Sequence, residues 1–175
     1  ERFAGRDGEK NVARYLLGYE RALAAGREHG IAVFFGIETC LAGGHEDFLI
    51  YGVSPQFLYE NPFLYELSQQ EDYARVHAYG ALFYQAHPYR EPRCSPQNPA
   101  YLDGVEVFNA HPGHENHNDK ALAFAAAHHL AQSAGSDCHE YEHVGRSGIV
   151  LPEAVRNGKE LADYLRAQPA QLIRI

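Results

Sequence analysis

The feature that most restricts the fold of this chain is the alternation of short apolar runs with segments of helical periodicity. The apolar runs contain few polar positions, which is typical of strands buried on both faces of a sheet. Strands that alternate with helices favour right-handed β-α-β units and a parallel sheet, either open and doubly wound or closed into a barrel. The expected strands lie at 31–37, 47–52, 81–86, 104–109, 133–139, 149–151 and 172–175, and the expected helices at 11–29, 68–79, 118–129 and 159–166.

Local signals refine some of these boundaries. Ser68 is expected to be the N-cap of its helix, and Asn118 the N-cap of the alanine-rich helix that follows it. The segment 58–65 is interrupted by proline and is expected to be irregular. The segment 90–99 contains three prolines and is expected to be a loop.

Polar residues stand where several of the expected strands end. Glu38 follows the first run, His87 follows the third, and Asp137 and His139 close the fifth. Because the carboxyl ends of strands gather on one face in β/α folds, these side chains are expected to meet in one pocket. Along a strand, Asp137 and His139 would project to one side and Cys138 to the other.

Carboxylates and imidazoles that converge in this way are ligands for divalent metals. Each residue also has a simpler interpretation. Glu38 could be a helix cap or a surface residue, and Asp137 and His139 could be a hydrogen-bonded pair that shapes a turn. The placement of four such residues at strand ends favours the metal site.

Composition limits the partners of the chain. Its 175 residues suit one domain spanning 1–175, and the formal net charge of -8 disfavours binding to an anionic membrane or to a large nucleic-acid duplex. An anionic substrate therefore needs a locally positive site, which bound metals could supply. The three cysteines form no CxxC pair, and no apolar run could span a bilayer, so a cytoplasmic location is expected. The chain contains no methionine and begins at Glu1, so we expect its natural start to lie upstream.

Three motifs, in order, resemble the later motifs of the PHP (polymerase and histidinol phosphatase) superfamily. They are Gly-Ile-Glu at 36–38, Ala-His-Pro at 86–88 and Gly-Ser-Asp-Cys-His at 135–139. The resemblance runs over nearly the whole chain. It implies a distorted, TIM-like β/α barrel with a cluster of up to three divalent metals, such as Zn, Mn or Fe, and phosphoester hydrolysis as the usual chemistry.

The resemblance also implies a ligand set. Glu38 would bridge two metals, His87 would bind one of them, and Asp137 and His139 would belong to different metals. Where many members of the family have a histidine after the bridging glutamate, this chain offers Asp47, with His45 close by. An aspartate ligand would favour Mn²⁺ over Zn²⁺.

Two family motifs are absent from this sequence. The family opens with a His-x-His strand and then a Thr-Asp-His strand end, and neither occurs here. The first strands and their ligands are therefore expected to be missing, so that 1–175 would be a PHP-like domain that is incomplete at its N-terminus.

Further polar residues have less specific signals. Arg90 follows His87 by three residues and could bind a substrate phosphate or form a surface ion pair, and Arg146 has a similar but weaker signal. Glu106 could orient a ligand or pair with a base. The set His111, His114 and His117 could bind a separate metal, although a solvated loop rim is the favoured interpretation, and Cys138 is expected to be packed.

These observations predict a metal-dependent phosphoesterase that hydrolyses a phosphomonoester or phosphodiester of a small substrate through a metal-activated water. Asp137 or His139 would relay the proton of the leaving group. The alternatives are a PHP-like module that binds metal or a partner without catalysis, and a barrel hydrolase that acts on amide bonds.

Overall fold

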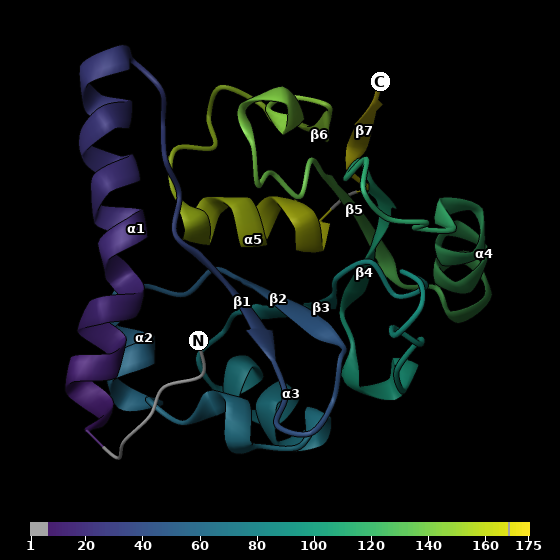
Figure 1. The fold of residues 1–175 in the computed structure, drawn as a ribbon, viewed down its shortest axis with the longest axis horizontal. Helices are drawn as coiled ribbons and strands as arrows, with labels where there is room; N and C mark the ends of the chain where they lie inside the picture. Colours follow the sequence, from purple (N-terminus) through teal and green to yellow (C-terminus); the bar gives the residue numbers. More distant parts are fainter. Residues whose placement is uncertain (1–6, 168) are drawn as a thin grey trace.

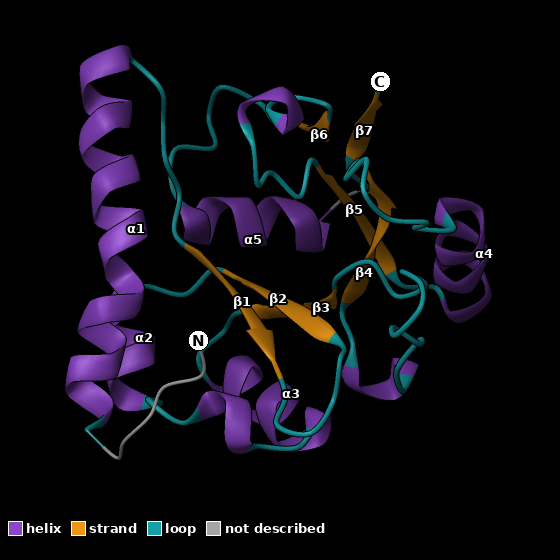
Figure 2. Ribbon diagram, in the orientation of Figure 1, coloured by secondary structure: helices purple, strands orange, loops and turns teal. Residues whose placement is uncertain are grey.

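The computed structural model describes residues 7–167 and 169–175, and its centre is a five-stranded sheet with the strand order β1-β2-β3-β4-β5 (Figures 1 and 2). A separate pair, β6 and β7, forms an antiparallel two-stranded sheet. The strands are β1 Gly36–Cys40, β2 Asp47–Tyr51, β3 Leu82–Gln85, β4 Gly104–Asn109, β5 Ala131–Gly135, β6 Ser147–Val150 and β7 Gln171–Arg174. The α-helices are α1 Gly8–His29, α2 Pro55–Glu60, α3 Gln69–Ala78, α4 Asn118–His128 and α5 Gly158–Ala167, and the 3-10 turns are η1 Leu64–Glu66, η2 Pro99–Tyr101 and η3 Tyr141–His143.

Both faces of the central sheet are covered. Phe48 and Phe83 stack with ring centroids 4.8 Å apart in a core that also takes in residues of α1, α3 and α4. On the other face, Leu82 and Tyr84 pack against Ala162 and Leu165 of α5. Alternate residues of β3 thus enter opposite cores, which explains why the strand is buried throughout. None of the helices described is long and apolar enough to cross a membrane.

The sequence predicted a parallel sheet, but the sheet is mixed. The strands β3, β4 and β5 are parallel neighbours, but β2 is antiparallel to both β1 and β3. Only residues 41–46 connect β1 to β2, and so short a link allows a hairpin but no crossover. The fold is α/β as predicted, but the described strands form open sheets and do not close into a barrel.

The first expected strand was misplaced, because the start of the apolar run at 31–37 contacts the end of α1 and only its last two residues belong to β1. The N–H of Ile31 donates to the carbonyl of Gly26 at 2.8 Å, and the side chain of Val33 lies so close to Gly26 that an added Cβ there would be 2.7 Å away. The ladder begins only at Gly36, and Glu38 therefore lies inside β1 and not after it.

Three other expectations differ in detail. The segment 58–65, expected to be irregular, includes the end of α2 and the start of η1. The expected strand at 133–139 ends at Gly135, since Asp137 has a φ of 46°, a left-handed conformation that no strand continues. His117 takes the N-cap position of α4, whereas the side chain of Asn118 accepts a hydrogen bond from the N–H of Asn109 at 3.0 Å. By contrast, Ser68 caps α3 as predicted, in a capping box with Glu71.

Candidate metal centre

The strand directions bring three potential ligands to one edge of the sheet. In the β1–β2 ladder Glu38 pairs with Leu49, so Asp47 is its diagonal neighbour on the same face. Because β2 runs against its neighbours, its first residue lies at the edge where β1 and β3 end. His87 follows β3 at that edge, where the carbonyl of Asp47 also accepts the N–H of Ala86.

Glu38, Asp47 and His87 form what we call the carboxylate cluster. The Nε2 atom of His87 lies 3.5 Å from Oε1 of Glu38 and 3.6 Å from Oδ2 of Asp47. One ligand atom from each residue lies within 4.8 Å of the others. The His87 side chain is buried, while that of Glu38 is 49% exposed. The cluster is therefore built on a buried imidazole and opens to solvent on the Glu38 side.

Arg90 supplies the positive charge of this site. Its Nη2 atom donates to Oδ2 of Asp47 at 3.0 Å, and its Nη1 atom lies 3.1 Å from Nε2 of His87 and 3.9 Å from Oδ2 of Asp137. A guanidinium can only donate, so Nε2 of His87 accepts this hydrogen bond and its lone pair points toward Arg90. Arg90 therefore joins Asp137 to the carboxylate cluster.

The charges of the cluster shift the pKa values of its members. Burial raises the pKa of the Asp47 carboxyl, and Glu38 adds to this, while His87 and Arg90 oppose it. Burial and the charge of Arg90 lower the pKa of His87, but the carboxylate of Glu38, 3.5 Å from Nε2, and the charges of Glu106 and Asp47 outweigh them, and the net shift is upward. The site thus concentrates negative charge around an imidazole.

Two buried residues of β4, Glu106 and Asn109, form hydrogen bonds with His87 and Asp137. Oε2 of Glu106 accepts the backbone N–H of His87 at 3.1 Å and the side-chain N–H of Asn109 at 3.0 Å. Burial raises the pKa of Glu106 to about 7, although the hydrogen bond from Asn109 opposes the shift. Asn109 also donates to Oδ2 of Asp137 at 3.2 Å. Glu106 therefore positions the loop that carries His87, and Asn109 positions Asp137.

Asp137 and His139 contact each other after β5. Nδ1 of His139 lies 3.3 Å from Oδ1 of Asp137 and 2.9 Å from its backbone oxygen. The Asp137 side chain is 11% exposed and that of His139 is 64% exposed. Of the four residues expected to meet, Glu38 and His87 are in contact, Asp137 joins them through Arg90 and Asn109, and His139 joins through Asp137. Cys138 is exposed, contrary to the expectation that it is packed.

The other sequence candidates are more scattered. Arg146 is exposed in the loop before β6, and no hydrogen bond or ion pair within the described ranges links its side chain to the carboxylate cluster. The carbonyl of His45 accepts a hydrogen bond from Cys94, and Nε2 of His117 lies 2.7 Å from Glu91. The rings of His111 and His114 stack with centroids 4.6 Å apart.

Sequence reasoning missed Asn109 and His143. Asn109 is the last residue of an expected strand, which is the position that marked the other candidates, but an amide was not considered as a supporting group. His143 lies in η3 and approaches His111, with ring centroids 4.8 Å apart. It follows His139 by four residues, a spacing that could have drawn attention to it.

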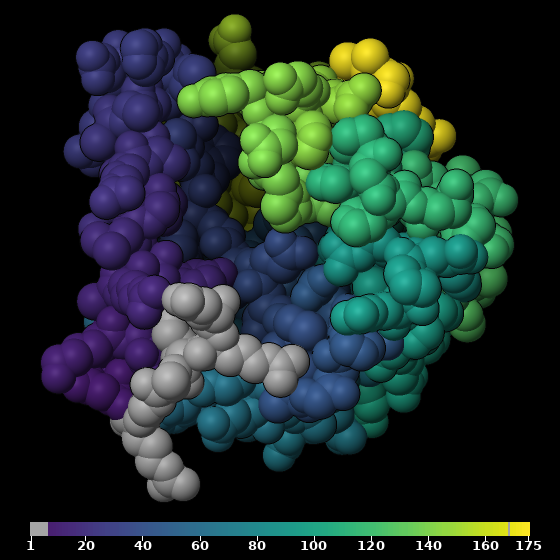
Figure 3. All heavy atoms as spheres, viewed as in Figure 1, coloured from purple at the N-terminus to yellow at the C-terminus, as the bar shows by residue number. Residues whose placement is uncertain are grey.

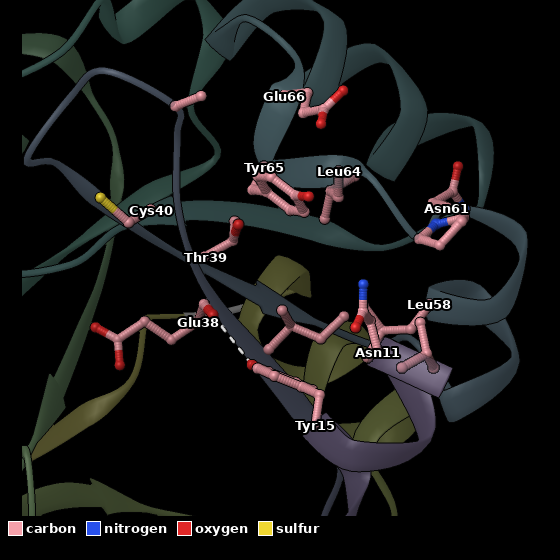
Figure 4. A pocket seen from close by; sticks show the side chains of 14 residues that line it. Asn11, Tyr15, Glu38, Thr39, Cys40, Leu58, Asn61, Leu64, Tyr65 and Glu66 are labelled. Carbon is pink, nitrogen blue, oxygen red and sulfur yellow. Dashed lines mark hydrogen bonds between the residues drawn. The ribbon is translucent and has the colours of Figure 1, made fainter. Parts of the chain in front are cut away.

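A cavity of about 730 Å³ lies on another side of β1, against α1, α2 and η1 (Figure 4). Its lining is mainly apolar and includes Val12, Leu58 and Leu64. Figure 4 shows the Glu38 carboxylate pointing away from Leu58 and Leu64, and the hydroxyl of Tyr15 donates to the Glu38 carbonyl at 3.1 Å. The cavity therefore meets the backbone of Glu38 but not the carboxylate that faces His87.

Comparisons with known proteins bear on the family of the chain. Residues 115–168 match the family described as PHP-associated. No curated protein matches the sequence. Among solved structures, PsfC from Pseudomonas syringae has a TM-score of 0.65 at 19% identity, over 83% of this chain and 61% of that chain.

A second solved structure is that of a two-domain protein from Bacteroides vulgatus containing a predicted PHP-like metal-dependent phosphoesterase. It has a TM-score of 0.65 at 15% identity, over 91% of this chain and 49% of that chain. This chain thus spans less than two thirds of either protein. At these identities the likeness concerns the fold. The PHP-associated match over 115–168 and the shared fold confirm the resemblance seen in the sequence, and both are consistent with the PHP superfamily.

Proposed function

We propose that the carboxylate cluster belongs to a metal-dependent phosphoesterase that hydrolyses a small phosphomonoester or phosphodiester. The observation that carries this proposal is the approach of ligand atoms from Glu38, Asp47 and His87 to within 4.8 Å of one another at the edge of the sheet. The resemblance to the PHP superfamily supports the choice of reaction. Because the chain spans only part of its structural relatives, the activity is proposed for the protein in its natural length.

The residues present fit a divalent cation. Two carboxylates and one imidazole suit Mn²⁺, Fe²⁺ or Zn²⁺. The guanidinium of Arg90 already contacts Asp47 and the lone pair of His87, so the surroundings favour a positive charge at this position. A divalent cation held there supplies Lewis acidity, which polarises a phosphoryl oxygen and promotes the ionisation of water near neutral pH.

The residues around the cluster have distinct proposed roles. Arg90 would turn from Asp47 to the phosphate, whose oxygens match its planar fork. Glu106 fixes the backbone of His87, and Asn109 holds Asp137 in place. The proton of the leaving group falls to Asp137 or His139, which lie 3.3 Å apart.

A non-catalytic module that binds metal or a partner is the second candidate. It is favoured by the small ligand set of the carboxylate cluster, which comprises Glu38, Asp47 and His87 among the described residues. Fewer ligands hold a metal less firmly and leave more of its coordination to water. Such a module would bind Mn²⁺ or Zn²⁺ without turning over a phosphoester.

The test measures metal binding and hydrolysis together. The protein is supplied with Mn²⁺ or Zn²⁺ and assayed with p-nitrophenyl phosphate, bis-p-nitrophenyl phosphate and an anilide. We expect phosphoester hydrolysis that Glu38→Gln and Asp137→Asn each reduce at least ~100-fold together with the Mn²⁺ content, since each removes a negative charge at the site. Glu28→Gln, on the exposed surface of α1, is the matched control.

Three outcomes would contradict the phosphoesterase proposal. Hydrolysis of the anilide alone would assign the cluster to amide chemistry. Mn²⁺ binding without any turnover would support the non-catalytic module. Hydrolysis that persists in Glu38→Gln would place the reaction away from the carboxylate cluster.

A further inference from the structure

Three histidines meet on the rim beside the carboxylate cluster. His111 comes from the loop after β4, His139 from the loop after β5 and His143 from η3. The ring centroid of His111 lies 5.1 Å from that of His139 and 4.8 Å from that of His143. One ring nitrogen from each of the three lies within 4.8 Å of the others. In Figure 3 the segments that follow β4 and β5 lie side by side on the visible face.

The hydrogen bonds of the three rings indicate which nitrogen of each could bind a metal. Nδ1 of His139 lies 2.9 Å from the carbonyl oxygen of Asp137, which can only accept, so Nδ1 carries the proton and Nε2 keeps its lone pair. Nδ1 of His111 accepts the N–H of Gly113 at 3.0 Å, and Nδ1 of His143 accepts the N–H of His139 at 3.2 Å. A metal would bind Nε2 of His139 and would take the Nδ1 lone pairs of His111 and His143 in place of these two backbone hydrogen bonds.

The contact with Asp137 also has a meaning for metal binding. A histidine ligand usually donates its second ring N–H to a carboxylate or a carbonyl, which fixes the ring and increases its basicity. Asp137 offers His139 both groups, with the carboxylate oxygen 3.3 Å and the carbonyl oxygen 2.9 Å from Nδ1.

We propose that His111, His139 and His143 form a second, nitrogen-only metal site that prefers Zn²⁺ to Mn²⁺. Three imidazoles and an open fourth position make a common zinc arrangement, whereas Mn²⁺ prefers oxygen ligands. His111 and His143 lie outside the motifs that carry the family resemblance. A metal held here would occupy Nε2 of His139, and Asp137 would then be the proton carrier in the proposed reaction.

The fourth position has a candidate within the same loop. The exposed ring of His114 stacks on His111, with centroids 4.6 Å apart and planes at 30°. Its coordination would close the site and tie the loop after β4 to η3. Without it, the position belongs to water or to a substrate group.

The experiment compares zinc and manganese binding by the metal-free protein. Calorimetric titration with Zn²⁺ and the visible spectrum with Co²⁺ are recorded for the wild type, His111→Ala and His143→Ala. We expect each variant to lose one zinc equivalent or to bind it at least ~100-fold more weakly, and to lose the Co²⁺ band of a nitrogen site, because one of three ligands is gone. His29→Ala, at the exposed end of α1, should match the wild type.

Two further variants separate this proposal from the proposed function. Glu38→Gln should weaken Mn²⁺ binding and leave the zinc site intact, and that result would hold even if no phosphoester were hydrolysed. His114→Ala should weaken zinc binding if His114 is the fourth ligand and otherwise change nothing. Wild-type zinc stoichiometry and affinity in a folded His111→Ala or His143→Ala, with folding checked by circular dichroism, would overturn the proposal.

Discussion

Arg90 balances the charge of the carboxylate cluster in the metal-free protein. It lies 3.0 Å from Asp47 and 3.9 Å from Asp137, and its side chain is only 23% exposed. Two partly buried carboxylates thus share one guanidinium. Since an uncompensated buried charge is costly, Arg90 stabilises the free protein, and it does so beside the ligand atoms of Asp47 and His87.

Removal of the Arg90 side chain should therefore have opposite effects on the stability of the metal-free protein and on its affinity for a metal. We expect Arg90→Ala to lower the free energy of unfolding in chelator by about 1–3 kcal/mol, because Asp47 loses its charged hydrogen bond. The variant should bind Mn²⁺ more tightly than the wild type, since no guanidinium competes. Chemical denaturation with chelator and titration with Mn²⁺ measure the two effects, and Arg21→Ala on the exposed face of α1 is the control. A simultaneous loss of Mn²⁺ affinity would show that Arg90 only organises the site.

The helix α3 has a capping box at its N-terminus and a buried carboxylate in its first turn. Ser68 and Glu71 form its capping box, but the next residue, Asp72, is fully buried. Neither carboxylate oxygen of Asp72 has a hydrogen-bond partner in the described part of the chain. Burial raises the pKa of Asp72 from 3.8 to about 7, although Arg75 lowers it in part. The helix therefore carries a carboxyl group that is more stable protonated than charged.

This shift predicts a loss of stability as the pH rises. Below the unfolded pKa of 3.8 Asp72 is protonated in both states and carries no charge penalty. Between that pH and about 7 the folded state keeps a proton that the unfolded state has released, so the free energy of unfolding falls as the pH increases. The full penalty, up to ~4 kcal/mol at ~1.4 kcal/mol for each pKa unit, remains above this range. Asp72→Asn should remove this part of the pH dependence in urea unfolding series, whereas Asp119→Asn, at the start of α4, should preserve it.

At the scale of elements, the sequence predicted what local chemistry determines. The start of α3 follows from Ser68 and the bounds of β4 from an apolar run framed by polar residues. The run at 31–37 misled because packing against Gly26 and pairing in a sheet demand the same apolar residues. The direction of β2 could have been derived from the short connection 41–46, but the alternation of strands and helices suggested a parallel neighbour.

The strand-end argument pointed to Glu38 and His87, and the family resemblance pointed to Asp47. Glu38, Asp47 and His87 come together because the carboxyl ends of β1 and β3 share an edge with the start of β2. The histidine cluster could not be predicted as a unit, because His143 lies in a 3-10 turn after a loop. Its approach to His111 depends on the folding of two loops, which no periodic pattern encodes.

At the scale of the whole molecule, charge separates small substrates from large ones. The chain has 23 acidic and 15 basic Lys and Arg residues, so its overall field repels polyanions. Within the described residues, Arg90 and any metal bound at the carboxylate cluster would offer an anion a positive site. A single phosphate group can reach such a site, whereas a duplex brings many phosphates against the negative surface.

We therefore expect no retention of duplex DNA by the protein at about 0.15 M salt, where charges are screened beyond about 8 Å. A small phosphoester should still compete with inorganic phosphate for the metal-loaded protein. Gel retardation with a duplex and with a single strand, in Mn²⁺ and in chelator, makes the comparison. Tight binding to the duplex in chelator would contradict the role given to net charge.

The connection 41–46 joins β1 to β2, so Glu38 and Asp47 sit on the two arms of one hairpin. Backbone pairs such as Cys40 with Asp47 fix the spacing of the two arms whatever the turn between them does. Residues can be inserted or lost in this turn while both ligands stay in register. In the proposed enzyme, a turn of another length would thus reshape the mouth of the site, and with it the choice of substrate, while the residues that would hold the metal remain in place.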